Sequence, residues 1–273
     1  MLLQETFTLA NGVEIPKLGL GTWMIDADKA EQAVKDAIAA GYRHIDTAQD
    51  YGNEAEVAAG IKNSGVPRSE LFLTTKLAAR YKDYEGAKEA IQGSLDAMDV
   101  EYIDLVIIHS PQPWDVFGGE NRYEKENLAA WKALEEFQQA GKIRAIGLSN
   151  FQQSDVQNIL DNGSVKPAVN QILAHITNVP AELIKFCQDN DILVEAYSPI
   201  GHGELFKNES VKEMAKKYSV SIPQLAIRFD YQLGLLPLPK TANPEHMKSN
   251  ADVDFEISED DMQTLLSLKK IKD

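Results

Sequence analysis

Short apolar runs alternate along the chain with longer segments in which apolar residues recur every three or four positions. Runs such as 104–108 (Asp-Leu-Val-Ile-Ile) are almost continuously apolar and β-branched, which is typical of strands covered on both faces. The apolar runs predict strands at Lys17–Leu20, His44–Asp46, Leu71–Lys76, Ile103–His109, Ala145–Ser149, Val169–Gln171, Leu193–Tyr197 and Leu235–Pro239. The helical spacing predicts helices near 29–40, 54–63, 85–98, 127–140, 153–162, 180–190, 209–218, 222–232 and 258–268.

The order of these elements favours one closed barrel. Asn11-Gly12 separates the short runs Thr6–Leu9 and Val13–Ile15, and Asn-Gly in this setting indicates a β-hairpin. Strands then alternate with helices without a proline-rich linker, so we expect residues 1–273 to form a single (β/α)8 TIM barrel behind an N-terminal β-hairpin. A doubly wound open sheet shows the same alternation, and periodicity alone does not decide whether a sheet closes.

Composition and charge restrict the classes of partner. The 273 residues suit such a barrel, which needs about 250. A formal net charge of −15 disfavours nucleic acid and anionic membrane surfaces, because both are negatively charged. The single cysteine, Cys187, cannot form an intramolecular disulfide, and the N-terminus lacks the pattern of a signal peptide. No stretch approaches the length of a membrane span, so we expect a cytoplasmic protein.

Polar residues stand at the ends of several predicted strands. In a parallel barrel all C-terminal strand ends open on one face, and active sites of such barrels lie there. Side chains that are far apart in sequence are therefore expected to meet on that face. The strand-end residues concerned are Asp46, Lys76, His109, Ser149, Asn150, Gln171, Tyr197 and Ser198.

Several of these residues lie within a set of motifs that runs along nearly the whole chain. The motifs are LGLGTW (18–23), GYRHIDTAQDYGNE (41–54), LFLTTK (71–76), DLVIIH (104–109), GKIRAIGLSNF (141–151), Asn170-Gln171, AYSPIG (196–201) and LPKT (238–241). Each motif is weakly diagnostic alone, whereas the full set in this order is specific. On these residues the chain resembles the aldo-keto reductase family, and its short C-terminus resembles the bacterial, diketogluconate-reductase-like branch.

The resemblance implies a catalytic tetrad of Asp46, Tyr51, Lys76 and His109. Hydride addition to a carbonyl leaves negative charge on the oxygen, so an acid must deliver a proton there, and the resemblance gives that role to Tyr51. A free tyrosine has a pKa of about 10. A charged Lys76 close by is expected to lower that pKa, and Asp46 is expected to hold the lysine charged and oriented. The imidazole of His109 is expected to bind the same oxygen and orient the carbonyl.

Each tetrad residue has a structural alternative when it is taken alone. A strand-end aspartate is often a helix cap or an ion-pair partner, and a lysine in a strand can extend along apolar surface to solvent. A strand-end histidine is often only hydrogen-bonded, and a single tyrosine usually packs. Their occurrence together at matching strand ends favours the catalytic interpretation.

No Gly-x-Gly-x-x-Gly turn joins a strand to a helix, so a Rossmann dinucleotide site is not expected. The resemblance instead implies NADPH bound across the strand ends, with its nicotinamide stacked on Tyr197 and its pyrophosphate under the loop 198–205. Side chains at 149, 150 and 171 would bind the carboxamide. The implied cofactor-binding residues are Gly21, Thr22, Asp46, Ser149, Asn150, Gln171, Tyr197, Ser198, Pro199, Ile200, Gly201, Gly203, Leu205, Lys240, Thr241, Ala242, His246 and Asn250.

The adenosine end departs from the family pattern. Six residues beyond the lysine of the Pro-Lys-Thr segment, the family usually has an arginine that faces the 2′-phosphate, and here that position is His246. A neutral histidine lacks the permanent charge and the forked donors of a guanidinium. Lys240 and Thr241 are retained, so we expect NADPH and leave NADH open as a second cofactor.

The resemblance assigns substrate binding to Trp23, Tyr51, His109, Ser110 and Trp114. Many family members carry bulky aromatic residues where this chain has Ala78 and Ser110. The pocket is therefore expected to be wider and less apolar, unless Trp114 or Phe117 fills it. We expect a small carbonyl substrate and a monomeric protein.

Three rival functions have distinct requirements. A Schiff-base aldolase could use Lys76 as nucleophile, but it leaves Gln171 and Tyr197 without a role. A metal-dependent hydrolase needs clustered ligands, and the histidines show no such spacing, so no metal is expected. A nucleotide-sensing subunit on the same fold would bind the cofactor with little turnover, and an intact tetrad argues against it.

Overall fold

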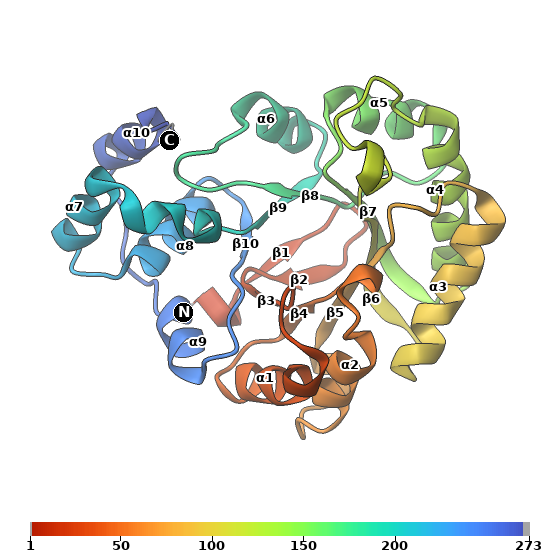
Figure 1. Cartoon of the computed structure of the whole chain (residues 1–273), viewed down its shortest axis with the longest axis horizontal. Helices are drawn as coiled ribbons and strands as arrows, with labels where there is room; N and C mark the ends of the chain where they lie inside the picture. The colour runs from red at the N-terminus through yellow and green to blue at the C-terminus, as the bar shows by residue number, and fades with distance from the viewer. Residues whose placement is uncertain (1, 270–273) are drawn as a thin grey trace.

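Eight parallel strands form the frame of the molecule in a computed structural model, which describes residues 2–269 (Figure 1). The strands are β3 Gly19–Gly21, β4 His44–Asp46, β5 Phe72–Leu77, β6 Ile103–Ile108, β7 Ile143–Ser149, β8 Val169–Leu173, β9 Leu193–Tyr197 and β10 Leu236–Leu238, paired in this order. A parallel bridge between Gly21 and Lys240 joins the first strand to the last, and the Gly21 N–H donates to the Pro239 carbonyl at 3.0 Å. The sheet is a barrel, as predicted, and the doubly wound alternative is wrong.

Helices surround the barrel (Figure 1). They are α1 Ala27–Ala39, α2 Glu54–Lys62, α3 Tyr84–Met98, α4 Glu124–Gln139, α5 Gln153–Asn162, α6 Ala181–Asp189, α7 Glu209–Lys217, α8 Ile222–Gln232, α9 Pro244–Ala251 and α10 Glu259–Ser267. Most of these helices bury one apolar stripe of their surface: α4, for example, buries Ala130, Trp131 and Leu134 and buries none of its charged residues. Short 3-10 turns add η1 Leu2–Gln4, η2 Gln49–Tyr51, η3 Arg68–Glu70, η4 Trp114–Val116 and η5 Gly201–Lys207.

Helix α9 is the one α-helix of the described residues that has no counterpart in the prediction. It buries only Met247 and Asn250, so it has no apolar stripe for a periodicity argument to detect. Its start carries a local signal instead. The Asn243 side chain accepts a hydrogen bond from the Glu245 N–H at 2.9 Å, and Pro244 occupies the first helical position.

The predicted N-terminal hairpin is confirmed. Strands β1 (Thr6–Thr8) and β2 (Glu14–Pro16) pair antiparallel, as Asn11-Gly12 indicates. Leu9 and Ile15 of this hairpin pack against Phe72, Leu105 and Leu236, side chains that come from three different barrel strands. The hairpin thus covers the end of the barrel where the strands begin, and the polar chemistry is left to the opposite end.

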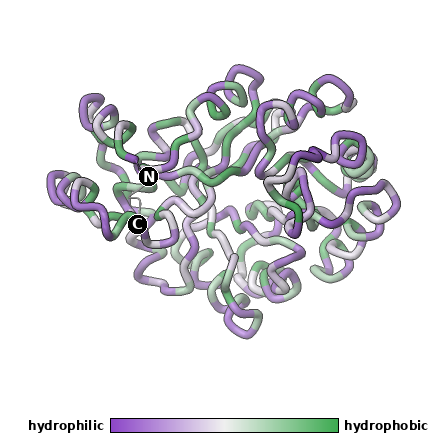
Figure 2. Tube along the Cα trace, turned by 45° about the horizontal axis from the view of Figure 1, so that its top comes forward, coloured by the Kyte–Doolittle hydropathy of each residue, from purple (hydrophilic) through white to green (hydrophobic). Residues whose placement is uncertain are grey.

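The hydrophobic residues gather in the strands and on the inner sides of the helices, whereas the outer turns are hydrophilic (Figure 2). At Gly19 of β3 the neighbouring elements approach closely, because a Cβ there would lie 2.6 Å from Leu238 and 2.7 Å from His44. Between residues 2 and 269, no helix has both the length and the apolar character that crossing a membrane requires.

Candidate active site

A cleft of about 410 Å³ opens at the C-terminal ends of the strands, within the usual size of small-molecule sites of about 300–1,000 Å³. Its lining residues come from strands and loops around the barrel. The lining residues are Gly21, Trp23, Asp46, Asp50, Tyr51, His109, Trp114, Ser149, Asn150, Gln171, Leu173, Tyr197, Ser198, His202, Leu238 and Lys240. Three members of the predicted tetrad line the cleft, and the fourth, Lys76, lies beneath it.

A buried ion pair joins β4 to β5 below the cleft. The Nζ atom of Lys76 lies 2.5 Å from Oδ2 of Asp46 and also donates to the Thr47 carbonyl at 2.8 Å. The lysine side chain is fully buried and that of Asp46 is 4% exposed. Burial works to lower the pKa of Lys76, but the Asp46 carboxylate and Tyr51 outweigh it, so this pKa lies above its ordinary value. Lys76 therefore stays charged.

Tyr51 lies over this pair at the end of η2. The Lys76 Nζ atom is 4.8 Å from the centroid of the Tyr51 ring. Burial raises the pKa of the Tyr51 phenol, and the opposing effect of Lys76 does not cancel it. The expectation of a lowered tyrosine pKa is thus corrected: Lys76 does act in that direction, but desolvation outweighs it. The phenol keeps its proton at neutral pH.

His109 directly follows β6 and lies across from Tyr51. Their rings are 5.8 Å apart and meet at 74°, edge to face. Burial lowers the pKa of His109 to about 3, and the charge of Lys76 acts in the same direction. The imidazole is therefore neutral at pH 7, with one donor and one acceptor nitrogen. Within the described residues its buried Nδ1 atom has no hydrogen-bond partner.

A second buried carboxyl group, Glu195 on β9, was not predicted. The Gln171 amide nitrogen donates both to Asp46 Oδ1 at 2.9 Å and to Glu195 Oε2 at 2.7 Å. Because two carboxyl groups face this nitrogen, it must be the donor end of the amide. Burial and the nearby Asp46 raise the pKa of Glu195 to about 8. The available signal was an acidic residue inside an otherwise apolar strand.

The wall on the other side of the cleft is held by Tyr197 and Asn150. The Tyr197 hydroxyl donates to Asn150 Oδ1 at 2.8 Å, and Asn150 Nδ2 donates to the His109 carbonyl at 3.0 Å. The Ser149 hydroxyl donates to the Gln171 carbonyl at 2.9 Å. These bonds fix the aromatic ring, the amide and the hydroxyl to which the family resemblance gives a role in nicotinamide binding.

The remaining residues predicted to bind the cofactor divide into two groups. Gly21, Ser198 and Lys240 line the cleft. The others do not line it. Thr22 directly follows β3, and the rest lie in the loop after β9 and in the β10–α9 segment; His246 is exposed on α9, whereas Asn250 is buried. This second group contains Thr22, Pro199, Ile200, Gly201, Gly203, Leu205, Thr241, Ala242, His246 and Asn250. In the loop after β9, Gly201 and Gly203 adopt φ values of +57° and +91°, a region that favours glycine.

The substrate side of the cleft is aromatic and contains residues the sequence did not indicate. Trp23 and Trp114 line it and are each 45% exposed, and the Trp114 ring packs edge to face on His109 at 5.0 Å. Ser110 is fully buried and does not reach the cleft, although the sequence placed it in the substrate pocket. The lining residues to which the sequence reasoning gave no role in the site are Asp50, Leu173, His202 and Leu238.

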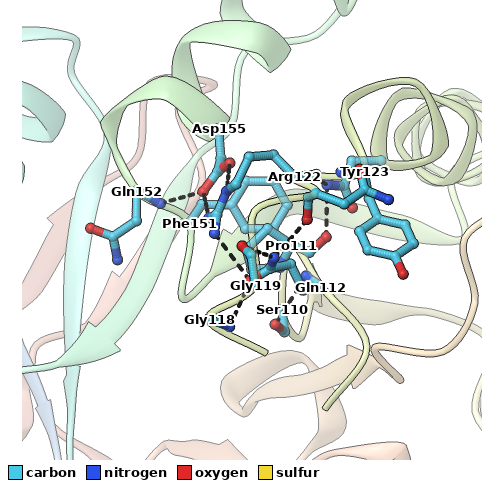
Figure 3. A network of polar contacts seen from close by, with 12 residues as sticks. Ser110, Pro111, Gln112, Gly118, Gly119, Arg122, Tyr123, Phe151, Gln152 and Asp155 are labelled. Atoms are coloured by element: carbon cyan, nitrogen blue, oxygen red, sulfur yellow. Dashed lines mark hydrogen bonds and ion pairs between the residues drawn. The ribbon is translucent and has the colours of Figure 1, made fainter. Parts of the chain in front are cut away.

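A polar network fastens the loop that carries Trp114, between β6 and α4 (Figure 3). The amide of Gln112 uses both its nitrogen and its oxygen for hydrogen bonds: the nitrogen donates to the carbonyls of Gly119 and Asn121, and the oxygen accepts from Gly118 N–H and Arg122. Arg122 also forms a two-point ion pair with Asp155 at the start of α5. The loop is therefore tied to the barrel although it lacks long secondary structure.

The geometry bears on the rival chemistries. Lys76 is fully buried and paired with Asp46, so its amine does not face the cleft as a Schiff-base nucleophile would. Across residues 2–269, no three His, Cys, Asp or Glu side chains come together in a group that could hold a metal ion.

Comparison with known proteins identifies the family. The model of the Aldo/keto reductase family matches residues 17–270, nearly the whole chain. The chain belongs to the aldo/keto reductase family. This reductase is an oxidoreductase by that membership, and Asp46, Tyr51 and His109 line the cleft of its barrel.

Individual relatives agree with this assignment. The reductase is 40% identical to glyoxal reductase of Bacillus subtilis over 98% of this chain and 94% of that protein. It is 38% identical to an aldehyde reductase of Saccharomyces cerevisiae, over 97% and 91% of the two chains. A Bombyx mori aldo-keto reductase solved in complex with NADP superposes with a TM-score of 0.88 at 32% identity, covering 97% of this chain and 93% of that one.

Proposed function

We propose that this protein reduces small aldehydes and ketones to alcohols with NADPH, using Tyr51 as the proton donor. The observation that carries the proposal is the stacking of Tyr51 over the buried Lys76–Asp46 pair, with the neutral His109 beside it in the cleft. The likeness to a glyoxal reductase and an aldehyde reductase supports a carbonyl substrate. The bacterial diketogluconate-reductase-like branch, a monomeric state and a cytoplasmic location stay predictions.

The cleft fits a nicotinamide nucleotide by the chemistry of its walls. Tyr197 offers a fixed aromatic face, and Gln171 turns its amide nitrogen toward two carboxyl groups, which leaves its oxygen to accept from a carboxamide. Lys240 at the rim supplies a cation for phosphate. The bound nucleotide would supply hydride to the carbonyl carbon.

The side chains of the cleft divide the remaining work. The neutral imidazole of His109 would hold the carbonyl oxygen and orient it toward the Tyr51 hydroxyl. Tyr51 would release its phenolic proton to that oxygen as negative charge develops there. Lys76 would stabilise the phenolate that remains, and Asp46 holds the lysine in place from below. The two tryptophans, Trp23 and Trp114, would limit the access of water.

The proposal is tested directly by following the loss of NADPH absorbance at fixed protein concentration with a panel of small aldehydes and ketones. Tyr51→Phe keeps the ring but removes the proton, so turnover should fall by roughly 10²–10⁴-fold while cofactor binding is kept. Tyr102→Phe is a matched control, because Tyr102 packs under Arg68 outside the cleft. Full activity in Tyr51→Phe would refute the role of this residue. Tight cofactor binding without turnover in the wild-type protein would favour the nucleotide-sensing alternative.

A further inference from the structure

Asp50 places a carboxylate in the cleft beside the proton donor. It precedes Tyr51 in η2, and its side chain is 23% exposed. Oδ1 accepts from Arg80 Nη1 at 2.6 Å, and Oδ2 accepts from the indole N–H of Trp114 at 3.2 Å. One carboxylate therefore connects the loops that follow β4, β5 and β6.

These two contacts leave Asp50 with capacity for another donor. A carboxylate accepts hydrogen bonds only, at about four lone-pair sites, and two of them are used here. The Arg80 side chain is 61% exposed, so its ion pair with Asp50 is screened by solvent and contributes little to stability. A fold that needed only a surface ion pair would not require this carboxylate to face the cleft.

The position of Asp50 relative to His109 limits where a ligand donor could lie. Oδ2 of Asp50 is 3.7 Å from Nδ1 of His109, too long for a direct hydrogen bond. His109 and Tyr51 are the groups that the proposed function places at the carbonyl oxygen. A donor that reaches Asp50 must therefore be attached close to the reacting carbonyl. A neutral donor suits the site better than a cation, because Arg80 already balances the charge of Asp50.

We propose that Asp50 determines specificity by accepting a hydrogen bond from a hydroxyl group on the carbon next to the reacting carbonyl. The preferred substrates are then short hydroxyaldehydes and hydroxyketones, and 2-oxo carboxylates are disfavoured because their charge repels Asp50. This inference rests on the proposed function, because it assumes that the carbonyl is reduced at Tyr51 and His109.

Two aldehydes of the same size and branching provide the test. Glyceraldehyde carries hydroxyl groups where 2-methylbutanal carries methyl groups, so the ratio of their kcat/KM values isolates the polar contact. Asp50→Leu should lower this ratio by about ten- to hundredfold relative to the wild-type protein, as expected for a hydrogen bond to a charged acceptor. Comparing the ratio between proteins cancels the hydration of each aldehyde in water. The change should come mainly from a lower kcat/KM for glyceraldehyde.

Two further variants separate hydrogen bonding from other effects. Asp50→Asn keeps the shape and one acceptor oxygen but removes the charge, so its ratio should lie between those of Asp50→Leu and the wild-type protein. Asp115→Asn removes an exposed charge from the loop after β6, outside the cleft, and should leave the ratio unchanged. With glyoxylate, a small 2-oxo carboxylate, Asp50→Asn should raise kcat/KM several-fold, whereas Asp115→Asn should not.

The outcomes distinguish the two proposals. The assignment of Asp50 would be overturned if Asp50→Leu and Asp50→Asn reduced both aldehydes with a kcat/KM ratio within twofold of the wild-type ratio. That result would leave the proposed function intact. An equal fall in Asp115→Asn would also overturn it, because a general surface charge would then explain the effect. If the wild-type protein reduced neither aldehyde nor any other carbonyl with NADPH or NADH, both proposals would be overturned.

Discussion

Replacing Lys76 by methionine tests the buried ion pair at the centre of the proposed mechanism. Methionine has a similar length and fits an apolar environment, so the change removes the charge with little change in volume. It leaves the Asp46 carboxylate, 4% exposed, without its cation, and it leaves the Thr47 carbonyl without its donor. The Gln171 amide remains as a donor to Asp46 Oδ1 at 2.9 Å.

The expected loss of stability follows from burial. Two unit charges about 4 Å apart attract by about 4 kcal/mol at an effective dielectric constant of about 20, and the charged atoms of this pair are closer than that. Removing one partner of a buried pair destabilises proteins by about 3–5 kcal/mol, because the other charge stays buried. We therefore expect Lys76→Met to lower the free energy of unfolding by about 3–5 kcal/mol, which corresponds to a fall in Tm of roughly 10 °C.

A double variant separates stability from chemistry. Asp46→Asn combined with Lys76→Met removes both charges, and the asparagine oxygen still accepts from Gln171. Neutral polar groups are cheaper to bury than a lone charge, so the double variant should recover about 2 kcal/mol of the loss. Both variants should have less than about 1% of wild-type turnover, because neither retains a cation to stabilise the Tyr51 phenolate. Urea unfolding followed by circular dichroism gives the stabilities, and NADPH absorbance gives the rates.

Two results would refute this reasoning. A double variant that is less stable than Lys76→Met would mean that the uncompensated Asp46 charge is not the source of the loss. A double variant with turnover near the wild-type value would mean that Tyr51 needs no cation. Measuring NADPH affinity in each variant controls for an indirect effect through Gln171, which touches Asp46.

Three further predictions concern other parts of the structure. Burial raises the pKa of Glu195 from 4.5 to about 8, so the folded state holds this proton more tightly and the free energy of unfolding falls as the pH rises between these values. Glu195→Gln should reduce that fall by roughly 4 kcal/mol when urea unfolding is measured at several pH values. An equal dependence of the free energy of unfolding on pH in the variant and the wild-type protein would contradict this prediction. Arg122→Met breaks the ion pair with the buried Asp155, so it should lower the free energy of unfolding by about 2 kcal/mol and raise KM for the carbonyl substrate. An unchanged KM would show that substrate binding does not depend on this attachment of the β6–α4 loop. His246→Arg should raise the preference for NADPH over NADH by about tenfold in kcat/KM. If the ratio of kcat/KM with NADPH to kcat/KM with NADH were unchanged, position 246 of α9 would not contact the 2′-phosphate.

Much of the site was predictable because strand ends of a parallel barrel meet on one face. Asp46 and His109 stand at or directly after strands, so barrel closure alone brings them to one cleft. Asp50 and helix α9 escaped prediction because they lack such a marker. Asp50 lies in a 3-10 turn, and its contacts with Arg80 and Trp114 depend on two other loops. Helix α9 has no apolar stripe, so periodicity could not reveal it.

The sequence by itself determined the types of element and their order, because apolar spacing fixes which face of each strand and helix must be buried. The Asn11-Gly12 hairpin and the helices with an apolar stripe follow from such local rules. Only the tertiary structure decided that Gly21 meets Lys240, and that burial outweighs Lys76 in setting the pKa of Tyr51. Both depend on groups brought together from distant parts of the chain, since closure and desolvation are properties of the packed molecule rather than of any one segment.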